Sequence, residues 1–196
     1  MTKRPSDFYG LVEREVWIGQ ETLQDALDIR ATVVHEGGAI VAVDPDRNGA
    51  LVIVDWMGRV VHRCDHRGSS WESARAHMLS IGVGVVLVEQ PYTGKFVSAG
   101  LSISRLVGAV LGSLLVSTRG AYLVHVSPTS WQKPLFALGP KPAREERKTA
   151  AFDYAVERLG GGEVEMVPSR WREGFCDAYG LAEWFRRLPD FYGESE

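Results

Sequence analysis

The chain has 196 residues, of which 45% are hydrophobic and 24% are charged. These values are typical of a globular protein and exclude a fibrous or largely disordered chain, and the length favours one compact domain with an extension. The longest uncharged apolar stretch, 107–116, falls far short of the roughly 20 residues that cross a bilayer, so we expect no membrane partner. No apolar run of a secretory signal follows Lys3 and Arg4, and the two cysteines are far apart, so we expect a cytoplasmic location with reduced thiols.

The net charge of −3 conceals a strongly basic segment in the middle of the chain. Residues 91–148 carry eight basic and two acidic side chains, a balance of +6, whereas the segments before and after it are acidic. A surface that binds a polyanion and an ordinary solvated face explain this segment about equally well. Its basic residues are Lys95, Arg105, Arg119, Lys133, Lys141, Arg144, Arg147 and Lys148.

The first half of the chain predicts four strands and one helix. Apolar runs at 39–43, 50–56 and 59–64 are separated by short turns, which indicates an antiparallel meander. A capping-box pattern at 69–72 predicts a helix that ends near Gly82. The apolar run 83–89 is typical of a strand buried on both faces, and the helix before it implies parallel pairing with an earlier strand.

The second half predicts three helices, one further strand and a loop. Residues 98–116 form a predicted helix with small residues at every fourth position, which favours close packing on its own sheet or, as the alternative, a dimer contact. A strand is expected at 121–126, and the prolines of 127–142 indicate a surface loop. The helix at 143–159 should turn Phe152, Ala155, Val156 and Leu159 inward. The last helix, 172–187, should bury Ala178, Leu181, Ala182 and Phe185.

This order of elements predicts an α/β fold of the ribonuclease H-like class, with a mixed five-stranded sheet flanked by helices. Residues 38–190 form the predicted nuclease domain. Residues 1–37 precede it as an N-terminal extension, in which 20–30 is a candidate helix.

Three acidic residues stand where the apolar pattern predicts burial. Asp44 follows the first strand of the meander, Glu89 ends the buried strand, and Asp177 interrupts the apolar face of the last helix. A buried carboxylate is costly unless it is paired, protonated or bound to metal. If the two strands are parallel neighbours, Asp44 and Glu89 emerge together, and a helix across that edge can add Asp177. Such a cluster predicts a site for Mg²⁺, and two ions would support phosphodiester hydrolysis.

A zinc site is the competing interpretation for His62, Cys64, Asp65 and His66. No second pair of ligands follows at the spacing of a zinc finger, so an ordinary strand end and turn is favoured.

Three short motifs occur in the order and spacing of a known family: Ala-Val-Asp-Pro at 42–45, Val-Glu-Gln-Pro-Tyr at 88–92 and Asp-Ala-Tyr-Gly-Leu-Ala at 177–182. Together they resemble the RuvC-type Holliday junction resolvases over roughly residues 39–187. The resemblance implies that Asp44, Glu89 and Asp177 bind two Mg²⁺ ions, for which Mn²⁺ would substitute. It also implies that Tyr92 contacts bases at the junction and that Lys133 and Lys148 bind phosphate or support catalysis. We expect Lys95, Lys141, Arg144 and Arg147 of the basic segment to bind DNA as well.

The sequence departs from the family at the fourth acidic position. Family members carry an acid or a histidine three residues before the helical aspartate, where this chain has Gly174. Glu173 lies on the same helical face and is the first candidate for the fourth metal ligand. Asp46, on the same side of a strand as Asp44, is the alternative.

The leading hypothesis is a homodimeric, Mg²⁺-dependent endonuclease that resolves four-way DNA junctions by paired nicks, acting in DNA recombination and repair. Two alternatives stay open. One is another ribonuclease H-like nuclease, acting on branched, duplex or hybrid substrates. The other is a structure-specific nucleic-acid-binding protein with a degenerate catalytic site.

Overall fold

The computed structural model describes residues 12–18, 23–46, 48–65, 70–90 and 120–192. Its strands are β1 (Val12–Ile18), β2 (Ala39–Val43), β3 (Ala50–Val54), β4 (Val60–Asp65), β5 (Val83–Glu89) and β6 (Ala121–Val126). Its helices are α1 (Leu23–Glu36), α2 (Ser70–Ile81), α4 (Pro128–Phe136), α5 (Arg144–Leu159), α6 (Gly161–Glu165), α7 (Ser169–Arg186) and α8 (Leu188–Tyr192). None of these helices combines the length and the apolar character that a membrane span requires.

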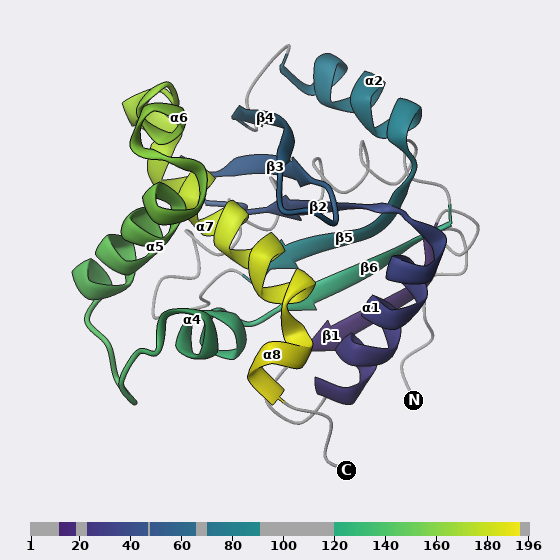
Figure 1. The fold of residues 1–196 in the computed structure, drawn as a ribbon, viewed down its shortest axis with the longest axis horizontal. Helices are drawn as coiled ribbons and strands as arrows, with labels where there is room; N and C mark the ends of the chain where they lie inside the picture. Colours follow the sequence, from purple (N-terminus) through teal and green to yellow (C-terminus); the bar gives the residue numbers. More distant parts are fainter. Residues whose placement is uncertain (1–11, 19–22, 47, 66–69, 91–119, 193–196) are drawn as a thin grey trace, which may run out of the picture.

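The strands form one mixed sheet in the order β1-β6-β5-β2-β3-β4 (Figure 1). β3 is antiparallel to both β2 and β4, which confirms the predicted meander. β5 runs parallel to β2 and to β6, which confirms the predicted crossover through α2. All five predicted strands are therefore present.

A sixth strand comes from the N-terminal segment. β1 pairs in parallel with β6 and extends the sheet at that edge. α1 follows it and buries Ala26, Ile29 and Val33, so the candidate helix of this segment exists and is longer than predicted. Part of the predicted extension thus shares the sheet and core of the rest of the chain.

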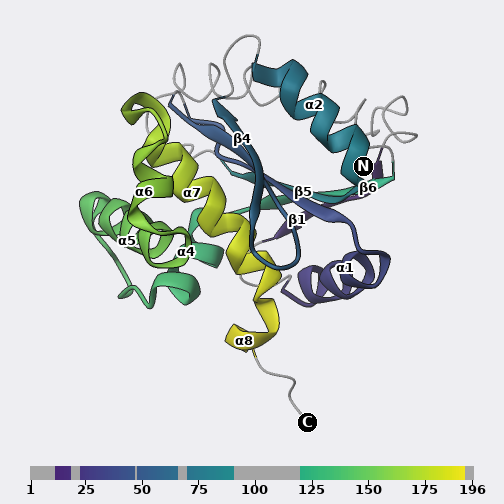
Figure 2. The same cartoon turned by 45° about the horizontal axis from the view of Figure 1, so that its top comes forward.

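Helices cover both faces of the sheet, with α2 on one face and α1, α4, α5, α7 and α8 on the other (Figures 1 and 2). The alternation of side chains along each strand produces two apolar cores. In β2, Ile40 and Ala42 face the large helical layer, whereas Val41 and Val43 face α2. The same alternation holds in β5, where Leu87 faces the large layer and Val88 faces α2.

Where the structure describes the predicted helices, their buried faces agree with the prediction, with one exception. Ala178, Leu181, Ala182 and Phe185 are all buried in α7. Phe152 on α5 was predicted to face inward, but it is 38% exposed. The buried face of α5 is instead formed by the smaller Ala151 and Ala155, which allow α5 to approach α7 closely.

The prediction of a loop over 127–142 is wrong in its first half, where the structure has α4. Pro128 occupies the first turn, where its missing N–H has no partner to lose. Trp131 and Leu135, four residues apart, are buried and attach the helix to the core. The prolines therefore mark the start of a short helix and a late position in it, and do not exclude one.

Candidate active site

Asp44 and Glu89 emerge next to each other from the middle of the sheet. Val43 of β2 pairs with Val88 of β5, so the residue after each of them leaves the sheet at the same edge. Because Val43 and Val88 face α2, the alternation along the strands turns Asp44 and Glu89 toward the opposite layer, where α7 lies. The sequence prediction that these two acids meet is confirmed by this register.

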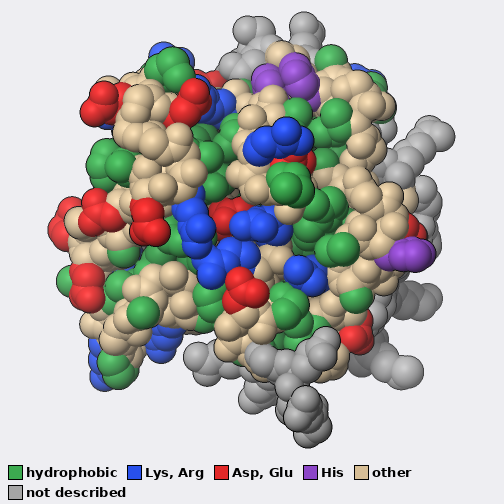
Figure 3. All heavy atoms as spheres, in the orientation of Figure 1, with side chains coloured by type: hydrophobic (Ala, Val, Ile, Leu, Met, Phe, Trp, Pro, Cys, Tyr) green, Lys and Arg blue, Asp and Glu red, His purple; other side chains and the backbone are tan. Residues whose placement is uncertain are grey.

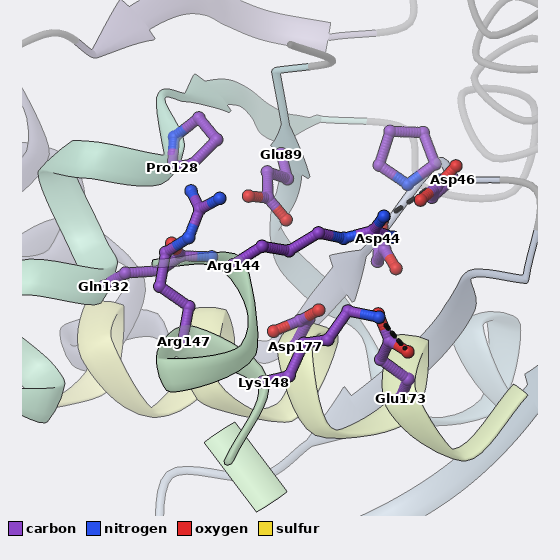
Figure 4. A pocket seen from close by; sticks show the side chains of 11 residues that line it. Asp44, Asp46, Glu89, Pro128, Gln132, Arg144, Arg147, Lys148, Glu173 and Asp177 are labelled. Atoms are coloured by element: carbon purple, nitrogen blue, oxygen red, sulfur yellow. Dashed lines mark hydrogen bonds and ion pairs between the residues drawn. The ribbon is translucent and has the colours of Figure 1, made fainter. Parts of the chain in front are cut away.

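Asp177 reaches the same place from α7. A cavity of about 390 Å³ is lined by Asp44, Glu89 and Asp177 together with residues of α4 and α5. Figure 4 shows the three carboxyl groups directed into this cavity from two strands and one helix. The backbone is fixed beside it, since the Asp46 N–H donates to Asp44 Oδ1 at 3.0 Å.

The three carboxyl groups oppose one another's ionisation. Burial, followed by the charge of Asp177, raises the pKa of Asp44 well above its ordinary value. Burial and the charges of Asp177 and Asp44 raise the pKa of Glu89 in the same way. Burial, followed by the charge of Glu173, raises the pKa of Asp177 to about 7. An arrangement of this kind is costly to the fold and is typical of functional sites.

One wall of the cavity is basic. Arg144, Arg147 and Lys148, all on α5, line it, and Figure 4 shows Arg144 and Lys148 extending among the carboxyl groups. By contrast, on the face that Figure 3 presents, the basic side chains near the middle stand beside acidic ones. Ion pairs of this kind occur at the end of α7, where Arg186 pairs with Glu183 and Arg187 with Asp190. The cavity wall is the basic surface best placed to meet an anion at the carboxylates.

The fourth acidic position on α7 cannot carry a side chain. A Cβ on Gly174 would lie 2.4 Å from the Cα of Gly49, because the turn between β2 and β3 crosses α7 at this point. The two glycines form an isolated parallel bridge. The close crossing explains why this chain has glycine where the RuvC-type pattern has an acid or a histidine.

Both candidates for the fourth ligand line the cavity. Glu173 is exposed and forms an ion pair with Lys148, with Nζ and Oε1 2.8 Å apart. Asp46 lies in the turn after β2, not in a strand as the alternation argument assumed, and this turn carries it to the same side as Asp44. Both acids are exposed at the rim of the cavity, so Glu173 and Asp46 both remain candidates for the fourth ligand.

The donor set fits a hard divalent cation, because carboxylate oxygens are the ligands that Mg²⁺ prefers and the like charges here need compensation. In the described ranges, however, no three His, Cys, Asp or Glu side chains are already gathered into a metal-binding cluster.

The other predicted DNA-binding residues are placed as follows. Lys133 on α4 is half-buried and Lys141 before α5 is exposed, and neither lines the cavity. Tyr92, Lys95 and the predicted helix 98–116 lie outside the described residues.

Gln132 is a site residue that the sequence analysis missed. It is 8% exposed and lines the cavity from α4. It was missed because 127–142 was interpreted as a loop. The spacing of Trp131 and Leu135 after Ser127-Pro128 was the signal that could have revealed the helix.

The candidate zinc ligands belong to a strand end, as the favoured interpretation held. His62, Cys64 and Asp65 line a separate cavity at the edge strand β4. Asp65 pairs with Arg170 at 3.1 Å, and burial raises the pKa of the Cys64 thiol to about 12. His66 lies outside the described residues.

No protein-family model matches the sequence, and no curated protein sequence matches it either. Solved structures do match. RuvC of Thermus thermophilus in complex with a Holliday junction substrate has a TM-score of 0.51 and 18% identity, covering 80% of this chain and 96% of that chain. A further structure of Thermus thermophilus RuvC has a TM-score of 0.52 and 19% identity, covering 76% of this chain and 96% of that chain.

At this level of identity the likeness shows the fold. The chain has a ribonuclease H-like α/β fold, as predicted from the order of its elements. Within that class its architecture is of the RuvC type, which confirms the fold implied by the three sequence motifs.

Proposed function

We propose that this protein is a Mg²⁺-dependent endonuclease that resolves four-way DNA junctions by paired symmetric nicks. The observation that carries the proposal is the meeting of Asp44, Glu89 and Asp177 in one cavity with a basic wall, on a RuvC-type fold. The solved relative with a Holliday junction substrate supports the choice of substrate. The hydrolysis of a phosphodiester bond is the chemistry that this combination of acids and cations serves best.

Asp44, Glu89 and Asp177 would hold two Mg²⁺ ions, with Asp46 or Glu173 as the fourth acid, and Mn²⁺ would substitute. Bound there, the ions would supply an activated water and stabilise the leaving oxygen of the scissile phosphate. The three acids must be ionised to act as ligands. Because these acids are buried together, all three can be ionised only when bound cations compensate their charge.

The chain's own basic residues act on the substrate phosphate. Lys148 lies on the cavity wall between Glu173 and Asp177, as its contact with Glu173 and its charge effect on Asp177 show. We assign it to the phosphate oxygens, where an ammonium group offsets the charge that develops in the transition state. Arg147 and Arg144, from the first turn of α5 onward, would bind the flanking phosphates and orient the strand.

More distant contacts would hold the arms of the junction. Lys133 follows the cavity residue Gln132 in sequence, and Lys141 precedes the cavity residue Arg144. We propose that both lysines, together with Lys95, contact the DNA backbone. Tyr92 would stack on a base near the crossover point. These contacts are largely electrostatic, so junction affinity should fall steeply with salt.

Two active sites are needed to cut two strands symmetrically, and one chain offers one set of acids. We therefore propose a homodimer with a two-fold axis. Light scattering of the free protein and of its junction complex tests this step. A chain that is monomeric in both would favour a general ribonuclease H-like nuclease.

A cleavage assay with Asp44→Asn tests the function directly. The wild-type protein should nick a four-way junction in Mg²⁺ and leave duplex and flap controls largely intact. Asp44→Asn keeps the shape of the side chain but removes one charge, so cleavage should be lost while junction binding is kept. Asp153→Asn, at an exposed position on α5, is the matched control and should cleave normally.

Three results would contradict the proposal. Residual cleavage by Asp44→Asn would show that Asp44 is a structural acid. Equal cleavage of all substrates would favour the general nuclease. Junction binding without cleavage by the wild-type protein would favour the degenerate binding protein.

A further inference from the structure

Trp131 carries a buried hydrogen-bond donor that has no partner. The residue lies in the first half of α4 and is fully buried. Its indole Nε1 is shielded from solvent, and no acceptor lies within hydrogen-bonding geometry of it. Such an orphaned donor costs about 1–3 kcal/mol, so its retention calls for an explanation.

The fold places this donor beside the candidate active site. Glu89 pairs with Val126 at the end of β6, and the Gln90 N–H donates to the Val126 carbonyl at 2.8 Å. α4 begins two residues later, at Pro128. Trp131 therefore lies in the first turn of α4, directly after the strand whose end is in register with Glu89, and its neighbour Gln132 lines the cavity.

The first turn of α4 is held in place by side chains. Ser127 Oγ and Ser130 Oγ lie 2.8 Å apart, and the Ser130 N–H donates to the Ser127 carbonyl at 3.0 Å. The hydroxyl of Tyr192 donates to the Ser130 carbonyl at 3.3 Å. The backbone that carries Trp131 is thus held both by Ser127 at the start of α4 and by Tyr192 of α8.

The indole ring is also fixed in its orientation. Gly180 on α7 provides the space for it, since a Cβ there would lie 2.8 Å from Trp131 Cζ3. Phe136 packs edge-on against the ring, with centroids 5.5 Å apart. A ring confined in this way cannot turn its N–H toward a different acceptor without repacking the contact with α7.

The acceptor within reach is the carboxyl group of Glu89. The Trp131 side chain lies near enough to the Glu89 carboxyl group to influence it as a hydrogen-bond donor, although the two are not in hydrogen-bonding geometry. An indole N–H can only donate and an ionised carboxylate can only accept, so the two groups match in the form of Glu89 that would hold a cation. The hydrogen bond between Trp131 Nε1 and the Glu89 carboxylate is not formed in this structure, in which the described carboxyl groups are not gathered into a metal-binding cluster.

We propose that Trp131 is a positioning residue for Glu89: its indole N–H donates to the ionised carboxylate and holds it toward the cavity. This role rests on the metal-dependent function proposed above. Metal ligands that receive such a second contact are better oriented, and loss of the contact lowers metal affinity or activity by about 10–100-fold.

Indole ¹⁵N–¹H NMR of the full chain tests the hydrogen bond without relying on activity. The Trp131 signal is identified as the one missing from Trp131→Phe. Addition of Mg²⁺ alone should move this signal downfield, because the indole N–H then forms its hydrogen bond with Glu89. The substitution Glu89→Gln should remove this shift. A second measurement is the Mg²⁺ concentration for half-maximal junction cleavage, which Trp131→Phe should raise about tenfold.

Trp184→Phe is the matched control. Trp184 is also fully buried with an unpartnered indole N–H, but it packs near Tyr192 and does not line the cavity. Its substitution removes the same atoms from the core and should leave the Mg²⁺ requirement within about twofold of the wild type.

The outcomes separate this inference from the function on which it rests. Mg²⁺-induced shifts elsewhere in the spectrum with an unmoved Trp131 signal would overturn the positioning role alone. Equal effects of Trp131→Phe and Trp184→Phe on the Mg²⁺ requirement would show a packing effect and overturn it too. A spectrum that Mg²⁺ does not change at all would overturn the metal-dependent function and this role with it.

Discussion

Two acidic residues on α7, Asp177 and Glu183, lie one and a half turns apart but in opposite surroundings. Glu183 is 1% exposed, yet it accepts two hydrogen bonds from Arg186, at 2.7 and 2.9 Å, and one from the Tyr154 hydroxyl at 3.4 Å. Asp177 instead faces Asp44, Glu89 and Glu173, and the pKa of its carboxyl group is raised to about 7. The first acid is compensated by direct hydrogen bonds within the fold. The charges of Lys148 and Arg147 compensate the second only in part, because the pKa of Asp177 stays raised.

This difference distinguishes a structural acid from a functional one. A buried charge with a well-placed partner is tolerated, whereas a cluster of like charges lowers stability and persists only where it serves a purpose. The difference between Asp177 and Glu183 can be tested by substitution and by pH.

Asp177→Asn should have the largest effect. It removes one charge from the acidic cluster, so we expect junction cleavage to fall by at least about 1,000-fold. The same change relieves repulsion and should raise the melting temperature of the metal-free protein. Cleavage assays and thermal denaturation in a chelator measure the two effects. A variant that is less stable but cleaves normally per folded molecule would show that Asp177 is a structural acid, like Glu183.

Glu183→Gln should show the reverse pattern. It leaves the partly buried guanidinium of Arg186 without its counter-charge, so we expect the free energy of unfolding to fall by about 2–3 kcal/mol. Cleavage per folded molecule should be unchanged. Chemical denaturation measures the loss, and Asp190→Asn, at a 56% exposed position paired with Arg187, serves as the control with an effect below about 1 kcal/mol. A similar loss in both variants would contradict the contrast.

The pH dependence of stability should reveal the acidic cluster. Asp177 holds its proton in the folded state up to about pH 7, whereas an unfolded aspartate loses it near pH 4. The folded state therefore binds more protons in this interval, so the metal-free protein should lose stability as the pH rises through it, by on the order of 1–3 kcal/mol. Asp44 and Glu89 act in the same direction.

Denaturation between pH 4 and 8, with a chelator and then with Mg²⁺, measures this loss. Mg²⁺ should restore stability near neutral pH, because it binds the ionised acids of the folded state. The decline should be smaller in Asp177→Asn. A metal-free protein whose stability rises over the whole interval would contradict the assignment of raised pKa values to these acids.

The site residues that could be predicted from the sequence are those whose positions follow from the local pattern of apolar and polar residues. The runs around Asp44 and Glu89 are long enough to identify as strands, and a crossover helix implies that the second runs parallel to an earlier strand, so their meeting was predictable if the two strands are neighbours. Asp177 was identifiable because it breaks an apolar helical face. The exposed position of Phe152 was not predictable, because it depends on how closely α5 and α7 approach each other through alanines.

The remaining features depend on contacts between segments far apart in sequence. Nothing local to Gly174 indicates that the turn at Gly49 crosses it. Nothing local to Glu173 indicates that Lys148, 25 residues earlier, pairs with it. β1 was missed as a strand because its acidic and basic residues conceal the alternation that indicates a sheet edge. Such features decide which acid becomes a ligand, and they come from tertiary packing.

The smallest effect is expected from Glu173→Gln, and it addresses the position that sequence left open. Glu173 is exposed and already paired with Lys148, so its main action in the present structure is to hold that ammonium group on the cavity wall. An exposed ion pair contributes at most about 1 kcal/mol, so loss of the tether should lower cleavage at saturating junction by about three- to fivefold. The Mg²⁺ requirement should stay unchanged, and the effect should vanish in a Lys148→Ala background, where there is no ammonium group to hold.

Asp46→Asn is the comparison, because loss of a carboxylate that serves as the fourth ligand should raise the Mg²⁺ requirement. If Glu173→Gln raises that requirement and Asp46→Asn does not, Glu173 is the fourth ligand, and it must leave Lys148 when it binds the metal.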